Sequence, residues 1–394
     1  MYKMNKGIRH ICFIMGPYPI QEHPINTFVA MLIQAVAKQG VKCTVIAPQS
    51  ITEHFVRKIS LRKEVEKQYI DNKNFITIYS PKYISFSSKE LFGFNTYGLT
   101  QSSYEKAILK EYRKRKINAD VLYAHFFLPS GIAALKLSDT EDIPVFIANG
   151  EADLSTFRFF DKNILREATK KITGIISVSS KNKTELIESE VLNSSIENNI
   201  IVIPNAIDKT IFYQIDQQKI RNELKMPTDA FIVAFTGSFI KRKGVDLLSQ
   251  ALEKVEGVYS IFIGNGPIEP SCGNILYKGS LPHNEIYKYL NAADVFALPT
   301  EAEGCPNATI EAMACGLPII SSDLPFNDDI LDDQNSIRID RNDIDKIADA
   351  IRFLRDNPQK RQKMSKASLS KARELDIETR AKKVITYIEQ QSGE

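Results

Sequence analysis

Residues 303–323, EGCPNATIEAMACGLPIISSD, combine a turn of small residues, a short helix and a buried strand. The acids Glu303 and Glu311 stand eight positions apart around this turn. A helix over 308–315, capped by Asn307, would point its first N–H groups and its dipole at a phosphate. Small residues let a ligand approach the main chain, and sugar hydroxyls would satisfy the two carboxylates. The alternative is a helix whose first turn carries an acid only to complement the dipole.

Short apolar runs bounded by glycine or small polar residues recur along the chain and predict buried strands. Helical apolar spacing separates these runs. At the start, a strand over 11–15, a helix over 27–39 and a strand over 41–47 follow one another. This alternation is typical of a doubly wound α/β sheet. The further predicted strands are 121–123, 145–148, 174–178, 200–203, 231–235, 260–263, 275–277, 295–298 and 318–321.

The length of the chain predicts two domains, because 394 residues exceed one ordinary core. A turn-rich stretch interrupts the strand series, and we place a linker from Pro204 to about Asp229. We therefore expect two Rossmann-like domains that face a cleft. The first, over 1–208, would bind the acceptor of a reaction and the second, over 209–376, the donor. A last helix within 377–394 is expected to pack back on the first domain.

Composition indicates an ordinary globular protein, with 43% apolar and 25% charged residues and a net charge of +3. The five cysteines are scattered and include no C-x-x-C pair, which favours a reducing cytoplasm and argues against a zinc site. The opening apolar run is too short for a signal peptide, and no long apolar segment follows. We expect a cytoplasmic protein, with peripheral contact to the inner membrane left open, and no nucleic-acid partner.

Several strand exits in the second half carry residues suited to a diphosphate. The loop 236–244, TGSFIKRKG, holds Lys241, Arg242 and Lys243 before a predicted helix. A lysine there could meet a diphosphate, and the alternative is a solvated turn. The segment 264–266, Gly-Asn-Gly, is a weaker signal that a plain turn explains equally well.

Strand exits in the first half also carry candidate residues, because ligands of doubly wound sheets bind beyond the carboxyl ends of the strands. Gly16, His125, Asn149 and Gly150 fall at such exits. His125 precedes two phenylalanines, so a core or capping histidine is the alternative. The acids of 343–345, Asp-Ile-Asp, are explained by a helix start, and no metal-ligand spacing stands out.

Two stretches of the first half suggest a surface partner. The segment 104–117, YEKAILKEYRKRKI, predicts a strongly basic helix. The segment 86–97 carries apolar side chains with an exposed pattern. Together they could hold an anionic membrane by insertion and charge, although a basic helix is more often a solvated face. The apolar residues concerned are Phe86, Leu91, Phe92, Phe94 and Tyr97.

The stretch 303–323 resembles the E-x7-E signature of the family 4 retaining glycosyltransferases of GT-B fold. Similarity to this family continues through nearly the whole chain and in the family's order. The segments that carry it are 120–131, 143–153, 175–179, 203–208, 237–244, 264–267 and 279–281.

The resemblance implies a nucleotide-sugar donor, by default a UDP-sugar, and a saccharide or lipid-linked saccharide acceptor in cell-surface polysaccharide or O-antigen biosynthesis. It implies retention by same-face attack, with no cofactor or metal. Glu303 would hold donor-sugar hydroxyls, Glu311 the ribose hydroxyls and Lys243 the diphosphate. The implied catalytic residues are His125, Glu303 and Lys243, and the implied acceptor contacts are Asn149 and Gly150. The implied donor-binding residues are Gly16, Gly237, Ser238, Arg242, Lys243, Gly264, Gly266, Leu281, Glu303, Gly304, Cys305, Pro306, Asn307, Ala308 and Glu311.

The chain also departs from the family pattern. Ser238 stands where an arginine is frequent, so one phosphate contact is missing or passes to Arg242. Cys305 replaces a frequent aromatic residue, Asn149 a frequent histidine, and the segment 23–27 a flexible glycine. A non-catalytic nucleotide-sugar-binding protein of the same fold is the alternative, and Ser238 is its best support. A nucleotide-sugar epimerase of GT-B fold is a further alternative, although such enzymes lack the paired acids.

Overall fold

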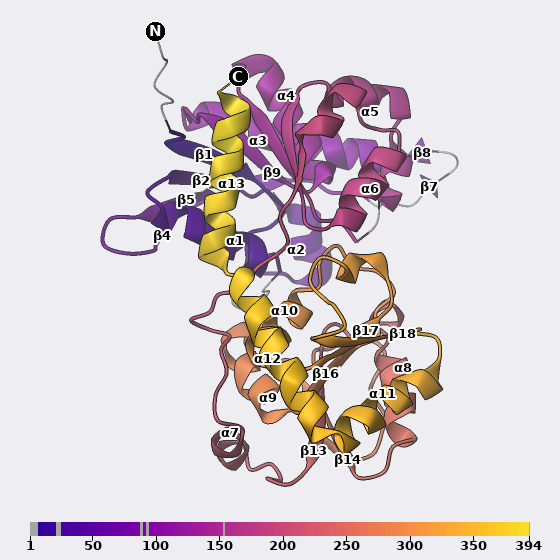
Figure 1. Ribbon diagram of the computed structural model, residues 1–394. Helices are drawn as coiled ribbons and strands as arrows, with labels where there is room; N and C mark the ends of the chain where they lie inside the picture. The colour runs from indigo at the N-terminus through magenta and orange to yellow at the C-terminus, as the bar shows by residue number, and fades with distance from the viewer. Residues whose placement is uncertain (1–6, 21–24, 87–89, 92–93, 153, 394) are drawn as a thin grey trace. The chain divides into compact units, whose positions relative to one another are not determined.

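The computed structural model describes residues 7–20, 25–86, 90–91, 94–152 and 154–393 (Figure 1). The chain divides into two compact units. Unit 1 consists of Met1–Ile203 with Glu378–Glu394, and unit 2 of Pro204–Ile377. Each unit contains one large sheet with helices on its faces, which confirms the predicted α/β class with two doubly wound sheets.

The sheet of unit 1 has the strand order β12-β11-β10-β9-β1-β2-β5-β4. All neighbours pair in parallel except β4 and β5, which are antiparallel. The order reverses between β1 and β9, so the carboxyl ends of these two strands form the switch point. The strands are β1 (His10–Ile14), β2 (Lys42–Ile46), β4 (Val65–Tyr69), β5 (Phe75–Tyr79), β9 (Val121–His125), β10 (Val145–Asn149), β11 (Ile172–Ser177) and β12 (Ile200–Val202).

Sequence analysis missed the antiparallel pair β4–β5. The strand β4, VEKQY, alternates exposed and half-buried side chains and buries no apolar residue fully. A half-exposed edge strand of this kind lacks the apolar run that predicts a buried strand. Two further sheets of two strands each were also missed, β3 (Gln49–Ser50) with β6 (Lys82–Tyr83) and β7 (Glu90–Leu91) with β8 (Phe94–Asn95).

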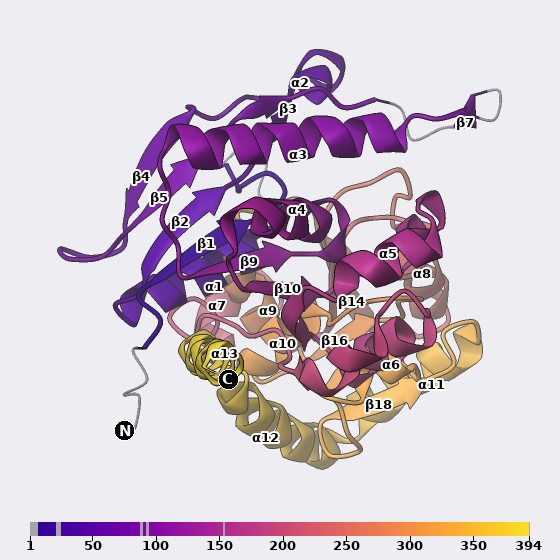
Figure 2. The same cartoon turned by 90° about the horizontal axis from the view of Figure 1, so that it is seen from above.

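Helices cover both faces of the sheet in unit 1. Helices α3 and α4 lie side by side over one face, where Tyr104, Ile108 and Leu122 share a large apolar core (Figure 2). Helix α13 packs on the other face, with the Tyr387 ring 6.0 Å from the Phe146 ring. The helices are α1 (Thr27–Lys38), α2 (Ile51–Arg57), α3 (Tyr97–Lys114), α4 (Ile132–Glu141), α5 (Lys162–Thr169), α6 (Ser180–Glu188) and α13 (Ile377–Ser392), with shorter turns η1 (Phe127–Gly131), η2 (Ser155–Phe159) and η3 (Ser194–Asn199).

The basic half of α3 is largely neutralised by neighbouring acids. Arg113 pairs with Glu141, and Arg115 pairs with Glu111. Lys114 pairs with Glu64. The strong positive field expected from 104–117 is therefore reduced by ion pairs within unit 1. Of the apolar residues predicted beside it, Phe92 lies outside the described residues, as do the side chains of Leu91 and Phe94.

The sheet of unit 2 has the fully parallel order β15-β14-β13-β16-β17-β18. The order reverses between β13 and β16, so the loops after these two strands meet at the switch point. The strand β18 (Ser336–Ile339) was missed because SIRI is short and interrupted by an arginine. The other strands are β13 (Phe231–Thr236), β14 (Val258–Ile263), β15 (Ile275–Gly279), β16 (Val295–Leu298) and β17 (Ile319–Ser322).

The expected linker over 204–229 is wrong for most of its length, because it contains helix α7 (Gln217–Glu223) packed within unit 2. Arg221 of this helix is 2% exposed, and its Nη2 lies 2.8 Å from Oδ2 of Asp294. The remaining helices of unit 2 are α8 (Val245–Glu253), α9 (Ile286–Ala292), α10 (Asn307–Ala314), α11 (Ile344–Asp356) and α12 (Pro358–Glu374), with turns η4 (Lys241–Lys243), η5 (His283–Glu285) and η6 (Pro325–Asn327).

Asp343 caps the start of α11 by accepting a hydrogen bond from the N–H of Lys346, as the helix-start interpretation predicts. Among the helices of the described ranges, none combines the length and the apolar character needed to cross a bilayer.

The buried Arg221–Asp294 pair gives a test of the packing of α7. Replacing Arg221 by methionine leaves the Asp294 carboxylate without its cation, which should cost about 3 kcal/mol of unfolding free energy. Urea denaturation measures this loss. The matched variant Lys219→Met removes an exposed cation from the same helix and should change stability by less than about 0.5 kcal/mol. Equal stability of the two variants would contradict this packing.

Candidate functional site

The centre of the candidate site in unit 2 is an ion pair between Lys243 and Glu303. The ammonium of Lys243, in η4 after β13, contacts Oε1 of Glu303 in the loop after β16. The guanidinium of Arg242 lies 3.6 Å from the same oxygen. Glu303 is 8% exposed, so its charge depends on these partners. The pair thus joins the two loops that meet at the switch point of the sheet.

Backbone contacts hold these two loops against each other. The Glu301 N–H donates to the Arg242 carbonyl oxygen at 2.8 Å, and Thr300 Oγ1 donates to the same oxygen at 3.2 Å. Gly244 has φ +71°, and a Cβ there would lie 2.2 Å from the Pro299 carbonyl oxygen. Only glycine fits this close approach, so the position of Lys243 is fixed by the residue that follows it.

The glycine loops after β13 and β14 also pack closely. A Cβ at Gly264 would lie 1.9 Å from the carbonyl oxygen of Gly237, and one at Gly266 would lie 2.4 Å from that of Phe239. The Phe239 N–H donates to the Asn265 carbonyl oxygen at 2.7 Å. Gly237, Gly264 and Gly266 therefore shape one continuous backbone surface, and Ser238 is exposed on it.

Helix α10 begins directly after the Glu303 loop. Asn307 is its first residue, not its cap, and the cap position is taken by Pro306 without a side-chain bond. The expected Asn307 cap is therefore wrong, because proline at 306 leaves Asn307 with helical geometry. The first bond of the helix runs from the Thr309 N–H to the Pro306 carbonyl oxygen at 3.0 Å. The N–H groups of Asn307 and Ala308 precede this bond and point out of the helix start.

Glu311 is the fifth residue of α10, so the explanation of an acid in the first turn does not apply. Its side chain is largely buried, and its Oε1 lies 2.8 Å from Nε2 of His283. Burial of His283 lowers the pKa of the ring, but the hydrogen bond and charge of Glu311, with Asp208, raise it above its usual value overall. The sequence analysis did not identify His283, and its only signal is its position two residues after Leu281.

The other predicted donor residues of unit 2 lie in the same loops. Gly304, Cys305 and Pro306 are buried between β16 and α10. Asn205 Nδ2 donates to the Cys305 carbonyl oxygen at 3.4 Å. Leu281 follows β15, the strand next to β14 at the edge of the sheet. The structure thus brings the predicted donor residues of unit 2 to the carboxyl ends of its parallel strands. Gly16 belongs to unit 1.

In unit 1, His125 ends β9 next to the switch point and is 3% exposed. Within the described part of the chain, neither ring nitrogen has a hydrogen-bond partner. Burial, and secondarily the charge of Arg380, lower the pKa of His125 to about 3, so the ring is neutral at neutral pH. Two rings pack against it, Phe28 at 5.2 Å and Phe126 at 4.4 Å. Burying an imidazole without a hydrogen-bond partner costs free energy of folding. Such a ring is suited to bind a ligand that supplies the missing partner.

Glu151, which the sequence analysis missed, lies next to this histidine loop. Its Oε1 accepts the Phe127 N–H at 2.6 Å and its Oε2 accepts the Gly150 N–H at 3.0 Å, so one carboxylate ties the exits of β9 and β10 together. Burial raises the pKa of Glu151 to about 7, against the opposing effect of these N–H donors. The sequence signal that could have identified Glu151 is its position directly after the predicted pair Asn149 and Gly150.

The predicted acceptor residue Asn149 is buried and its amide group serves the fold. Its Nδ2 donates to Ser177 Oγ at 3.1 Å and to the Asn182 carbonyl oxygen at 2.9 Å. Gly150 packs closely on Val178, 3.2 Å from where a Cβ would stand. The acceptor role of both residues, and the donor role of Gly16, remain predictions. His23 and Pro24 of the departing loop lie outside the described residues.

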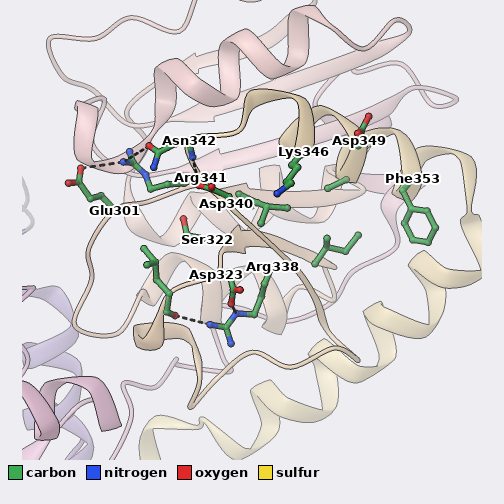
Figure 3. A pocket seen from close by; sticks show the side chains of 14 residues that line it. Glu301, Ser322, Asp323, Arg338, Asp340, Arg341, Asn342, Lys346, Asp349 and Phe353 are labelled. Atoms are coloured by element: carbon green, nitrogen blue, oxygen red, sulfur yellow. Dashed lines mark hydrogen bonds and ion pairs between the residues drawn. The ribbon is translucent and has the colours of Figure 1, made fainter.

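Unit 2 also contains an open pocket of about 1150 Å³ at the carboxyl ends of β17 and β18, beside α11 (Figure 3). Its cations are paired with neighbouring acids. Arg338 contacts Asp323 at 3.0 Å, and Arg341 contacts Glu301 at 3.4 Å. The pocket includes none of the predicted site residues. Among the described side chains, no cluster of three or more metal-ligating residues occurs.

Two family models match the chain. The model described as "Glycosyl transferases group 1" matches residues 216–371, and the model described as "Glycosyltransferase Family 4" matches residues 25–210. TuaC of Bacillus subtilis, whose name refers to teichuronic acid biosynthesis by a glycosyltransferase, is 28% identical over 322 residues. That alignment covers 80% of this chain and 81% of TuaC.

Solved structures share the fold at low sequence identity. Sucrose-phosphate synthase of Thermosynechococcus elongatus superimposes with a TM-score of 0.76 at 16% identity, covering 97% of this chain and 98% of that one. HepE of Anabaena, solved in complex with UDP and glucose, has a TM-score of 0.69 at 15% identity, covering 97% and 100%. At these identities the likeness shows the fold alone.

The Glu151 carboxyl makes stability depend on pH. The folded pKa of Glu151, about 7, is above its unfolded value. The protonated carboxyl therefore contributes to the free energy of unfolding in full below the unfolded pKa, and this contribution is lost as pH rises through 7. The variant Glu151→Gln cannot ionise, so its stability relative to wild type should improve by about 2 kcal/mol between pH 5 and pH 8.

Thermal or urea unfolding across that pH range measures the trend, which is independent of any constant loss caused by the amide. Glu167→Gln, an exposed acid of α5, is the matched control and should show no such trend. A constant difference between wild type and Glu151→Gln at all pH values would contradict the raised pKa.

Proposed function

The chain belongs to the family 4 glycosyltransferases of GT-B fold, and on this premise we propose that it is a retaining transferase that uses a nucleotide-sugar donor. The proposed donor is a UDP-sugar, and the proposed acceptor is a saccharide or lipid-linked saccharide of a cell-surface polysaccharide. The proposed location is the cytoplasm, with peripheral contact to the inner membrane. The relative TuaC, named for teichuronic acid biosynthesis, and the structure of HepE in complex with UDP and glucose support this choice.

One observation carries the proposal: Lys243, Glu303 and the start of α10 lie together at the switch point of unit 2. In the free protein, Lys243 and Glu303 neutralise each other. A nucleotide sugar offers each of them a better partner, because its diphosphate is an anion and its sugar carries hydroxyl donors. Lys243 would then bind the diphosphate and Glu303 the sugar. The free N–H groups of α10 would face the phosphate.

The proposed reaction needs little chemistry from the protein itself. The bond between the sugar C1 and the diphosphate oxygen breaks, and a bond from C1 to the acceptor oxygen forms on the same face. The acceptor proton passes to the leaving diphosphate. Lys243 and the α10 start stabilise the negative charge that develops on that diphosphate, so positioning and electrostatics supply the rate. No metal or cofactor is part of the proposal.

His125 of unit 1 is proposed to contact a hydroxyl of the donor sugar. Its neutral ring can donate from one nitrogen and accept at the other, and both nitrogens lack partners among the described residues. A neutral ring of this kind orients a sugar but does not act as a general acid at pH 7. Glu151 would keep the turn after His125 in place through the Phe127 N–H.

The second candidate is a protein that binds a nucleotide sugar without transferring it. Ser238 favours it, because a serine supplies no charge to the phosphate where the family often has an arginine. Arg242 lies nearby, but its guanidinium donates to the Ala302 carbonyl oxygen and approaches Glu303. Donor binding without turnover would identify this candidate.

The transferase proposal predicts that Lys243→Ala lowers sugar transfer by at least about tenfold, equivalent to about 1.4 kcal/mol of barrier, because the leaving diphosphate loses its cation. Nucleotide release from the preferred donor measures the effect. Lys241→Ala is the matched control, since Lys241 is an exposed cation of the same loop and should leave activity within about twofold. A loss below tenfold for Lys243→Ala would contradict the assigned role.

A small apolar patch of unit 1 supports contact with a membrane. Ile84, Phe86 and Leu99 are each about half exposed. The segment that carries Ile84 and Phe86 runs beside the first turns of α3, with the Phe86 N–H bonded to Thr100 Oγ1 at 2.8 Å. Exposed Lys106 and Lys110 follow on α3. Apolar side chains beside lysines suit insertion into an anionic bilayer surface.

We therefore expect the protein to sediment with liposomes that contain anionic lipid at low salt, where surface attraction is strongest. The double variant Phe86→Ser and Leu99→Ser should reduce the bound fraction by about fivefold or more. Phe353→Ser removes an equally exposed phenylalanine from unit 2 and serves as the control. Failure of the wild-type protein to bind, or equal binding by the double variant, would contradict the membrane contact.

A further inference from the structure

Among the side chains that the structure describes, the imidazole of His283 is the one partner of the Glu311 carboxylate. Nε2 of His283 lies 2.8 Å from Oε1 of Glu311, and this bond joins η5 to α10. Within the described residues, no hydrogen bond is found to the second oxygen, Oε2. The carboxylate is thus held at one oxygen and open at the other.

The histidine is itself held in place. Its ring packs edge-on against Phe212, with 5.1 Å between the ring centres, and Phe212 is buried. The side chain of His283 is 27% exposed and that of Glu311 only 11%. The hydrogen bond between His283 and Glu311 is therefore partly shielded from water. In such a shielded place a hydrogen bond to a charged group is stronger than at the surface.

Position in the chain links this bond to the nucleotide. His283 lies on the loop after β15, two residues after Leu281, one of the donor-binding residues implied by the family resemblance, which assigns its main chain to the nucleotide base. Glu311 lies on α10 and is proposed to meet the ribose. The His283–Glu311 bond fixes the distance between these two elements, so base and ribose contacts are set together.

Building on the proposed ribose role of Glu311, we propose that His283 is a positioning residue for the donor nucleotide. Its N–H holds Oε1 of Glu311 and leaves Oε2 to accept from the ribose hydroxyls. A free glutamate side chain would have to give up rotamer freedom when the donor binds, and this cost lowers affinity. The bond to His283 fixes the rotamer beforehand.

A purely structural brace between η5 and α10 makes a different prediction. It would affect folding and all ligands alike, without regard to the ribose. The positioning role instead predicts a loss that depends on the N–H donor at residue 283 and on the ribose hydroxyls.

The test is calorimetric titration of the full-length protein with UDP, GDP and ADP, followed by the 2′-deoxy form of the nucleotide that binds. His283→Phe keeps the aromatic contact with Phe212 but removes the donor, and His283→Gln retains an N–H donor. We expect His283→Phe to weaken nucleotide binding about tenfold and His283→Gln by less than about threefold. Of the two His283 variants, only His283→Phe should show a smaller preference for the ribonucleotide over its deoxy form.

Two controls separate the possible failures. Asn284→Ala, an exposed neighbour in η5, should bind as wild type does. Glu311→Gln reports on the proposed function: if it binds as tightly as wild type, or if wild type binds none of the nucleotides, the ribose role of Glu311 falls and this inference falls with it. If Glu311→Gln loses affinity but His283→Phe does not, or if His283→Gln is as weak as His283→Phe, the positioning role alone is overturned.

Discussion

The ion pair between Lys243 and Glu303 is the interaction on which the candidate site depends. It spans the switch point of the unit 2 sheet, where the loops after β13 and β16 meet. A largely buried carboxylate requires a positive partner, and Gly244 allows the lysine loop to come close enough to provide one. The same two groups are suited to separate when a diphosphate and a sugar arrive. The free protein therefore keeps both charges in place by pairing them.

The two acids of the 303–323 stretch are distinguished by their partners. Glu303 is paired with a cation that an anionic ligand can draw away. Glu311 is hydrogen-bonded to His283, which is not assigned to the diphosphate in the proposed function. The Glu311 rotamer can therefore remain fixed during binding. In the proposed function, this difference would let one helix start serve both the reacting sugar and the ribose. These different partners fit the separate roles that the family resemblance implied and that we propose.

Long apolar runs were predictable from the sequence, and half-exposed elements were not. Strands such as β1 and β16 bury every side chain, whereas β4 and β18 mix charged and apolar residues at sheet edges. The sequence singles out Glu303 and Lys243 because each lies in a loop after a buried strand, and Glu311 because it stands eight positions after Glu303. His283 and Glu151 act through hydrogen bonds to residues distant in sequence or to backbone N–H groups. Single-sequence patterns do not reveal such contacts, and the Asn307 cap failed because Pro306 shifts the helix start by one residue.

The central claim is that this site takes a nucleotide sugar and transfers its sugar with retention. Proton NMR of the full-length protein with a panel of nucleotide sugars and a membrane extract tests this directly, because one spectrum reports donor consumption and the anomeric configuration of the product. The account predicts that one donor releases its nucleoside diphosphate and that the product keeps the donor's anomeric configuration. Donors that bind but are never consumed, or a product of inverted configuration, would contradict it.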